Sequence, residues 1–210
     1  MTSEPTIVQI DTPHGEARAH LHHAGDPRAA LVLGHGAGGG VAAPDLVAAT
    51  GAGLEAHVTV ALVEQPYRVA GRRSQAPARQ LDAAWEAVVD HLREGELAGL
   101  RVLTGGRSAG ARVACRTASA TGTEGILCLA FPLQPPRRAG GKPSPSRLPE
   151  LEAVTVPVLI VQGERDRFGM PPAAAGRTVV AVPGDHSLRS DPGAVGAAVG
   201  SWLAELAPAG

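Results

Sequence analysis

The sequence predicts an α/β fold, with a mostly parallel sheet of about seven to eight strands and helices on both faces. Short apolar runs alternate with helical patterns along nearly all of the 210 residues. Most of these runs are continuously apolar, which is typical of parallel strands buried on both faces. Hydrophobic residues make up 44% of the chain and charged residues 19%, a composition that excludes a disordered protein. The length fits a single domain, residues 1–210.

The chain is expected to begin with an antiparallel hairpin, because the short runs Thr6–Ile10 and Ala17–His22 can pair with each other. Ala29–Leu33 is continuously apolar and ends at a glycine, so it predicts the first strand buried on both faces. A helix is expected over Pro44–Glu55, since proline suits the first turn of a helix. The next buried strand is expected at Val58–Val63.

The same alternation continues to the C-terminus. Apolar residues at helical spacing predict a helix over Ala78–Arg93, and a strand at Leu100–Thr104 runs through a glycine-rich turn into a helix that reaches about Ala120. Three more strands are expected, at Gly125–Phe131, Val156–Gln162 and Thr178–Val182. One helix is expected between the last two of these strands, and the last helix is expected at Pro192–Glu205. Right-handed crossovers would then bring the loops after the parallel strands to one edge of the sheet.

Composition and charge exclude several classes of function. The chain has 19 basic and 20 acidic residues, so no positive excess predicts binding to nucleic acid or to an anionic membrane. The N-terminus does not resemble a signal peptide and no apolar window is long enough to span a bilayer, so a cytoplasmic location is expected. Cys115 and Cys128 are too few for a disulfide framework and are not spaced as metal ligands, so both are expected to be buried as small hydrophobes.

The strongest chemical pattern is Gly106-Arg107-Ser108-Ala109-Gly110, which fits G-x-S-x-G between a predicted strand and a predicted helix. In that context the turn exposes the serine hydroxyl at the edge of the sheet. A serine needs a base to take its proton, and the base needs an orienting acid. Asp166 and His186 each follow a later strand, in the chain order Ser, Asp, His. We therefore expect Ser108 as nucleophile, His186 as base and Asp166 as its orienting acid.

Acyl transfer also needs donors for the oxyanion. The loop Gly34–Gly40 follows the first buried strand, and we assign the oxyanion donors to the backbone amides of Ala37 and Ala109. His35 is expected to brace this loop. The possible pocket residues are His35, Gly36, Tyr67 and Arg107. A cation at position 107 either favours acidic substrates or packs against an outer element, and the sequence leaves both interpretations open.

The loop Gly34–Gly40 has a rival interpretation. Gly34, Gly36 and Gly39 fit G-x-G-x-x-G after a strand, with Glu64 at the end of the next strand where a ribose-binding acid would lie. This is a weak pattern in a glycine-rich chain, and it leaves the serine, aspartate and histidine unexplained. Nucleotide binding therefore stays a minor alternative.

Taken together, these segments resemble the α/β-hydrolase superfamily. The matching segments are LGHGAGGG, EQPYRVAGRR, GGRSAG, FPLQPPRRAGGKP, VQGERDRFG and PGDHS, spread over residues 31–187. More narrowly, the chain is similar to the small lidless branch related to dienelactone hydrolases and testis-expressed hydrolase-like proteins. The resemblance implies an α/β-hydrolase fold without a lid domain and a Ser108–His186–Asp166 triad. It also implies hydrolysis of an ester-like bond through an acyl-enzyme.

The expected function is therefore a serine hydrolase acting on a small carboxylic ester or thioester, with no cofactor and no metal, as a monomer or homodimer. The alternative is a non-catalytic interaction protein that keeps the hydrolase fold, in which His186 or Asp166 would turn away from Ser108. The Pro-rich segment Gln134–Pro149 is expected to be an exposed loop, where larger relatives insert a lid. A short loop and few aromatic residues predict a shallow site that prefers polar or short acyl groups.

Overall fold

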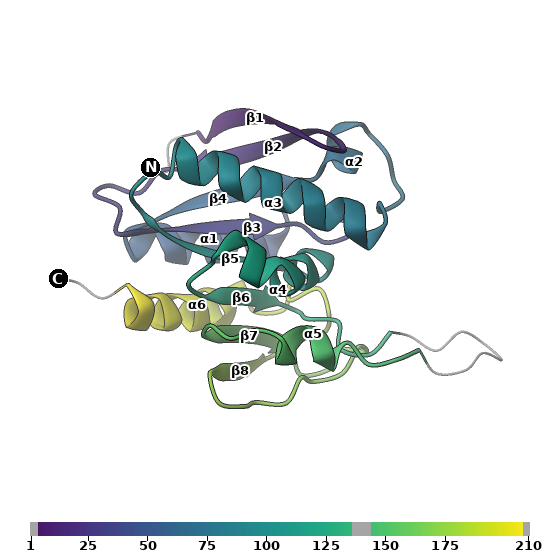
Figure 1. Ribbon diagram of the computed structural model, residues 1–210. Coiled ribbons are helices and arrows are strands. Elements are labelled where there is room, and N and C mark those ends of the chain that lie inside the picture. The colour runs from purple at the N-terminus through teal and green to yellow at the C-terminus, as the bar shows by residue number, and fades with distance from the viewer. Residues whose placement is uncertain (1–3, 136–143, 208–210) are drawn as a thin grey trace.

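One eight-stranded sheet organises the chain, in the strand order β1-β2-β4-β3-β5-β6-β7-β8 (Figure 1). The computed structural model describes residues 4–135 and 144–207. The pairs β1–β2 and β2–β4 are antiparallel, and every other neighbouring pair is parallel. The fold class expected from the sequence is therefore confirmed. The strands are β1 Thr6–Thr12, β2 Gly15–His22, β3 Ala29–Gly34, β4 Val58–Glu64, β5 Arg101–Arg107, β6 Ile126–Leu129, β7 Val158–Gly163 and β8 Arg177–Val182.

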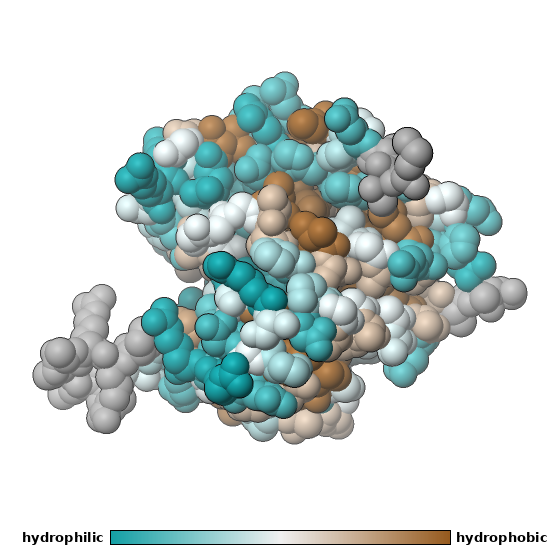
Figure 2. Space-filling model, turned by 180° about the vertical axis from the view of Figure 1, so that it is seen from behind, coloured by the Kyte–Doolittle hydropathy of each residue, from teal (hydrophilic) through white to brown (hydrophobic). Residues whose placement is uncertain are grey.

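Helices cover both faces of this sheet. Figure 1 shows α1 and α6 behind the sheet, and α3, α4 and α5 in front of it. Figure 2 looks onto the face with α1 and α6, where brown and pale residues gather in the middle. The helices are α1 Pro44–Glu55, α2 Pro66–Val69, α3 Ala78–Glu94, α4 Ala109–Thr121, α5 Leu148–Glu152 and α6 Pro192–Leu206.

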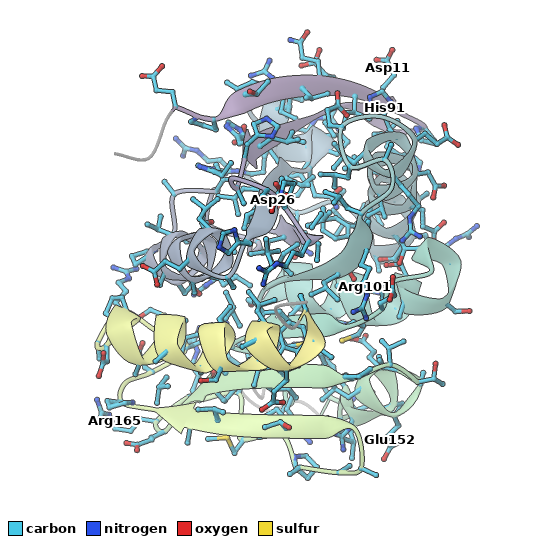
Figure 3. All side chains as sticks on the ribbon, turned by 90° about the vertical axis from the view of Figure 1, so that its left-hand side faces the viewer. Asp11, Asp26, His91, Arg101, Glu152 and Arg165 are labelled. Carbon is cyan, nitrogen blue, oxygen red and sulfur yellow. The ribbon has the colours of Figure 1, made fainter. Side chains whose placement is uncertain are left out.

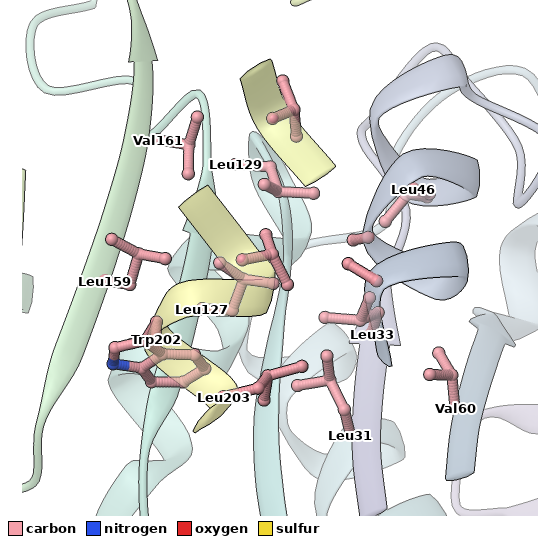
Figure 4. Close-up of a cluster of buried hydrophobic side chains, with 14 of the residues drawn as sticks. Leu31, Leu33, Leu46, Val60, Leu127, Leu129, Leu159, Val161, Trp202 and Leu203 are labelled. Atoms are coloured by element: carbon pink, nitrogen blue, oxygen red, sulfur yellow. The ribbon is translucent and has the colours of Figure 1, made fainter. Parts of the chain in front are cut away.

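Aliphatic side chains fill both layers. Trp202 and Leu203 of α6 lie over the sheet with Leu127 of β6 and Leu159 of β7 in the cluster beneath α1 and α6 (Figure 4). On the opposite face Trp85 of α3 is fully buried against the sheet. Cys115 and Cys128 are free and buried in a third cluster, which confirms that they pack as small hydrophobes.

Three local expectations were wrong. No helix forms between β7 and β8: residues 164–176 make turns and an isolated bridge, because glycines and two consecutive prolines interrupt any helix there. The short helix α2 was not expected. The helix α5 begins at Leu148, inside the segment that was expected to be a loop. Residues 136–143 of that Pro-rich segment lie outside the described residues.

The parallel strands present their carboxyl ends at one edge of the sheet. In Figure 3, Arg165 just after β7 and Glu152 just before it lie at opposite ends of the β7–β8 pair. The segments that follow β3, β5 and β7 all emerge at the carboxyl edge, where ligands bind in open α/β sheets. Within the described part of the chain, no helix is long and apolar enough to cross a membrane.

Candidate active site

Ser108 is the single residue between β5 and α4. Its φ of 52° and ψ of −104° are strained for a residue with a Cβ, and its N–H donates to the carbonyl of Leu129 at 2.8 Å. Gly106 and Gly110, two residues before and two after Ser108, lie too close to the backbone of Gly34 to carry a side chain. A Cβ on Gly106 would lie 2.4 Å from the carbonyl oxygen of Gly34, and a Cβ on Gly110 would lie 2.3 Å from the same atom. The strained turn thus holds the serine hydroxyl out at the carboxyl edge.

His186 joins Ser108 to Asp166 through two hydrogen bonds. Its Nε2 lies 2.9 Å from Oγ of Ser108, and its Nδ1 lies 2.7 Å from Oδ2 of Asp166. A carboxylate oxygen only accepts, so we assign the imidazole proton to Nδ1, which leaves Nε2 as an acceptor for the serine hydroxyl. The Asp166 side chain is 1% exposed and that of His186 17%. This geometry does not favour the non-catalytic alternative, in which His186 or Asp166 would turn away from Ser108.

The Asp166 carboxylate is held by further donors. Oδ2 accepts a 2.8 Å hydrogen bond from Nε2 of Gln162, and Oδ1 accepts one of 2.9 Å from the N–H of Phe168. Both carboxylate oxygens are therefore engaged. The sequence reasoning missed Gln162 and Phe168. The available clue for Gln162 was a polar residue at the end of an apolar run, and in the structure its side chain is buried.

The loop that carries His186 packs against the end of β7. A Cβ on Gly163 would lie 2.4 Å from the carbonyl oxygen of Asp185, so the loop backbone approaches the strand closely. The ring of Phe168 lies against the imidazole of His186, with centroids 4.4 Å apart and planes at 53°. These contacts fix the imidazole from the side of β7.

The loop after β3 is braced from within, as expected for His35. Nδ1 of His35 donates to the carbonyl of Gly36 at 2.8 Å, and Nε2 accepts from the N–H of Gln65 at 3.2 Å. Burial lowers the pKa of His35 below its usual value, which favours this neutral form. The hydroxyl of Tyr67 donates to the carbonyl of Ala37 at 3.2 Å. Tyr67 therefore helps to hold the loop.

The two candidate oxyanion donors remain available. Within the described residues, neither the amide of Ala37 nor that of Ala109 donates a hydrogen bond. Gly110 packs closely against the carbonyls of Gly34 and His35, so the start of α4 lies against the loop after β3. Both peptide groups therefore come to the same edge as Ser108.

The Arg107 guanidinium contacts two other parts of the protein. Its Nη2 donates to the carbonyl of His186 at 3.0 Å, and its Nε lies 3.4 Å from Oδ2 of Asp45 in α1. The guanidinium is directed toward the His186 loop and the start of α1.

Two cavities lie near the site, a small one next to Ala109 and a larger one next to Tyr67. A hollow of about 10 Å³ is lined by residues that include His35, Tyr67, Ala109 and Val113. A cleft of about 340 Å³ lies on the other side of Tyr67, between the β1–β2 turn and α3. The two spaces share Gln65, Tyr67 and Leu81. Ala109, the residue after Ser108, lines only the small hollow, and Ser108 itself lines neither.

The glycine loop does not fit the dinucleotide interpretation. In that motif the glycines open a helix, whose N-terminus meets the phosphates. Here α1 begins only at Pro44, after Gly39 and several further residues. Gly36 instead faces the Arg107 side chain, and Glu64 lies 3.1 Å from the imidazole of His20.

This chain matches a known protein family and is similar in fold to several solved structures. Residues 27–191 match the model of an alpha/beta hydrolase domain. No curated protein matches the sequence. An α/β serine hydrolase without a lid from Xanthomonas campestris is similar, with a TM-score of 0.78 and 17% identity over 100% of this chain and 98% of that one. A dienelactone hydrolase from Anabaena variabilis has a TM-score of 0.73 and 15% identity over 96% of both chains. An esterase from Pyrococcus furiosus has a TM-score of 0.76 and 15% identity, covering 96% of this chain and 91% of its own.

Proposed function

The chain belongs to the alpha/beta hydrolase family, and on this basis we propose that it is a serine hydrolase that cleaves a small carboxylic ester or thioester through an acyl-enzyme on Ser108. The observation that carries the proposal is the continuous hydrogen-bonded chain from Oγ of Ser108 through His186 to Asp166. A hydroxyl next to a neutral imidazole, itself oriented by a buried carboxylate, is the arrangement that activates a serine.

In the first half of the reaction, Oγ of Ser108 attacks the carbonyl carbon while Nε2 of His186 takes the hydroxyl proton. The amides of Ala37 and Ala109 donate to the oxyanion that forms. Asp166 keeps the imidazolium in place through Nδ1. When the tetrahedral intermediate collapses, the bond to the leaving oxygen or sulfur breaks and His186 gives its proton to that atom. The acyl group remains on Ser108.

In the second half, His186 takes a proton from a water molecule that attacks the acyl carbon. The same amides stabilise the second oxyanion. Collapse breaks the bond to Oγ, and the proton on Nε2 returns to Ser108. The products are a carboxylic acid and an alcohol or thiol, and these residues supply every proton transfer that the two steps require.

The acyl group is proposed to be short or polar. The hollow of about 10 Å³ beside Ala109 has room for little more than one water-sized group. The methyl group of an acetyl is about as large as one water molecule, whereas longer acyl chains exceed the hollow. We therefore expect kcat/KM to fall as the acyl chain of p-nitrophenyl esters lengthens from acetyl to octanoyl.

The proposal is tested with a fluorophosphonate probe and p-nitrophenyl acetate. Wild-type protein should be labelled at Ser108 and should hydrolyse the ester, whereas Ser108→Ala should do neither. Ser119→Ala removes an exposed hydroxyl from α4, the helix that begins beside Ser108, and is the matched control. Folded wild-type protein that is neither labelled nor active would reject the proposal in favour of a non-catalytic protein with this fold.

A further inference from the structure

Arg107 occupies a unique place in the chain, because it is the last residue of β5 and directly precedes Ser108. Its side chain runs toward the loop that carries His186, where Nη2 donates to the carbonyl oxygen of His186 at 3.0 Å. One side chain therefore links the backbone before the candidate nucleophile to the backbone of the candidate base. The His186 loop is held on its other side by the turn after β7, where the N–H of Arg165 donates to the carbonyl of Gly184 at 2.9 Å.

Asp45 anchors the other side of the same guanidinium. This aspartate lies in the first turn of α1, its side chain is 1% exposed, and its Oδ2 lies 3.4 Å from Nε of Arg107. Oδ1 accepts from the N–H of Leu46 at 3.0 Å, and among the described residues Oδ2 has no hydrogen-bond partner. A buried carboxylate is costly unless a charge faces it, so Arg107 and Asp45 constrain each other.

The loop after β3 also contacts this guanidinium. A Cβ on Gly36 would lie 2.7 Å from Nη1 of Arg107 and 3.1 Å from its Cδ, so the side chain lies directly on the glycine. The peptide of Gly36 precedes Ala37, the candidate oxyanion donor. Three parts of the site therefore meet at one guanidinium: the His186 loop, the loop after β3 and the start of α1.

We propose that Arg107 is a positioning residue, which fixes His186 relative to Ser108 through the His186 carbonyl and takes its own orientation from Asp45. This inference rests on the proposed function. Burial raises the pKa of Asp45 and the Arg107 guanidinium opposes that rise, which agrees with a pairing of the two side chains. Because Arg107 touches no reacting atom, its loss should slow the chemical steps without weakening substrate binding.

The test compares Arg107→Gln, Arg107→Lys, Asp45→Asn and the double variant with the wild type. The rate of fluorophosphonate labelling, kcat and KM for p-nitrophenyl acetate, and the melting temperature are measured for each. We expect Arg107→Gln to lower kcat and the labelling rate by about 10- to 100-fold with KM within about twofold, because small misplacements of catalytic groups cost this much. Arg107→Lys keeps a cation beside Asp45 but loses the planar fork. Its kcat and labelling rate should therefore lie between those of Arg107→Gln and those of the wild type.

Asp45→Asn should have a smaller effect than Arg107→Gln, and it should add nothing in the Arg107→Gln background, since both act through one guanidinium. Arg189→Gln, the same substitution at an exposed arginine of the His186 loop, is the control. If Arg107→Gln does not fold, Arg107→Lys and Asp45→Asn carry the test. The inference is wrong if the folded variants change only the melting temperature or KM, or if the effects of positions 45 and 107 simply add. Inactive, unlabelled wild-type protein would instead reject the proposed function itself.

Discussion

The side-chain amide of Gln162 donates a 2.8 Å hydrogen bond to Oδ2 of Asp166. The same nitrogen lies 3.1 Å from the carbonyl of Phe131 and 3.0 Å from that of Gly169. The amide thus ties the end of β7 to the segments after β6 and β7. It also restrains the carboxylate that faces His186.

We expect Gln162→Leu to lower both stability and activity. Leucine has a similar size but donates nothing, so Asp166 and two buried carbonyls lose a donor. The free energy of unfolding should fall by about 1–3 kcal/mol, measured by urea denaturation. The value of kcat should fall by about tenfold as the carboxylate loses its fixed position. Gln9→Leu, at an exposed position of β1, is the matched control. Equal effects of the two variants would contradict the role assigned to Gln162.

Gly110 and Gly51 should respond to alanine with opposite signs. A Cβ on Gly110 would lie 2.3 Å from the carbonyl oxygen of Gly34 and 2.6 Å from its carbon, and neither backbone atom can move freely. Gly110→Ala should therefore destabilise the protein by about 1–3 kcal/mol and slow labelling of Ser108. Gly51 lies within α1, and a Cβ there would meet no atom within 4 Å, so Gly51→Ala should stabilise by about 0.5–1 kcal/mol. Denaturation midpoints of both variants give the comparison.

Regular elements were predictable where the sequence pattern alone determines them. The helix α1 begins and ends where the sequence predicted, because a proline starts it and apolar runs flank it on both sides. The strand β5 runs three residues further than expected, since its backbone continues to pair with β6 up to Leu129. Short helices such as α2 have too few residues for a periodic pattern. Their existence depends on packing against segments that are distant in the sequence.

Some features of the candidate site were likewise predictable from the sequence, and others were not. Ser108, Asp166 and His186 follow strands whose carboxyl ends must meet, so topology alone brings them to one edge. The partners of Arg107 were not predictable, because Asp45 and the carbonyl of His186 come from separate parts of the chain. Neither a motif nor a periodicity encodes such contacts. The same holds for the contact between the rings of Phe168 and His186.

Tyr67→Phe tests how firmly the loop after β3 is held. The variant keeps the ring but removes the hydroxyl that donates to the carbonyl of Ala37 at 3.2 Å. We expect stability to fall by about 0.5–1.5 kcal/mol. We also expect kcat for p-nitrophenyl acetate to fall a few-fold, because the oxyanion donor at Ala37 becomes less well placed. Lower stability with unchanged kcat would mean that the hydroxyl serves the fold alone.

The two thiols should be unreactive in the folded protein. Cys115 and Cys128 are buried, and their sulfur atoms lie 3.6 Å apart, well beyond the length of a disulfide bond. The hydrogen bond with Cys115, together with burial, raises the pKa of the Cys128 thiol well above its usual value. Ellman's reagent should therefore titrate neither thiol in native protein at pH 8 and both in guanidinium chloride. A thiol that reacts within seconds in the native protein would contradict this burial.

The buried imidazole of His35 should make stability depend on pH. Burial lowers its pKa in the folded protein, whereas in the unfolded chain it titrates near 6.5. The unfolded state therefore binds more protons below that pH, so this contribution to stability is present above pH 6.5 and is lost progressively as the pH falls from there toward the lower pKa of the folded protein. The loss is at most about 1.4 kcal/mol for each pH unit. His35→Gln keeps an acceptor for the N–H of Gln65 but does not titrate. Urea denaturation between pH 7.5 and 5.5 should show a shallower loss for His35→Gln than for the wild type, with His14→Gln as the exposed control. Parallel curves for wild type and His35→Gln would show that the imidazole is not held neutral by the loop.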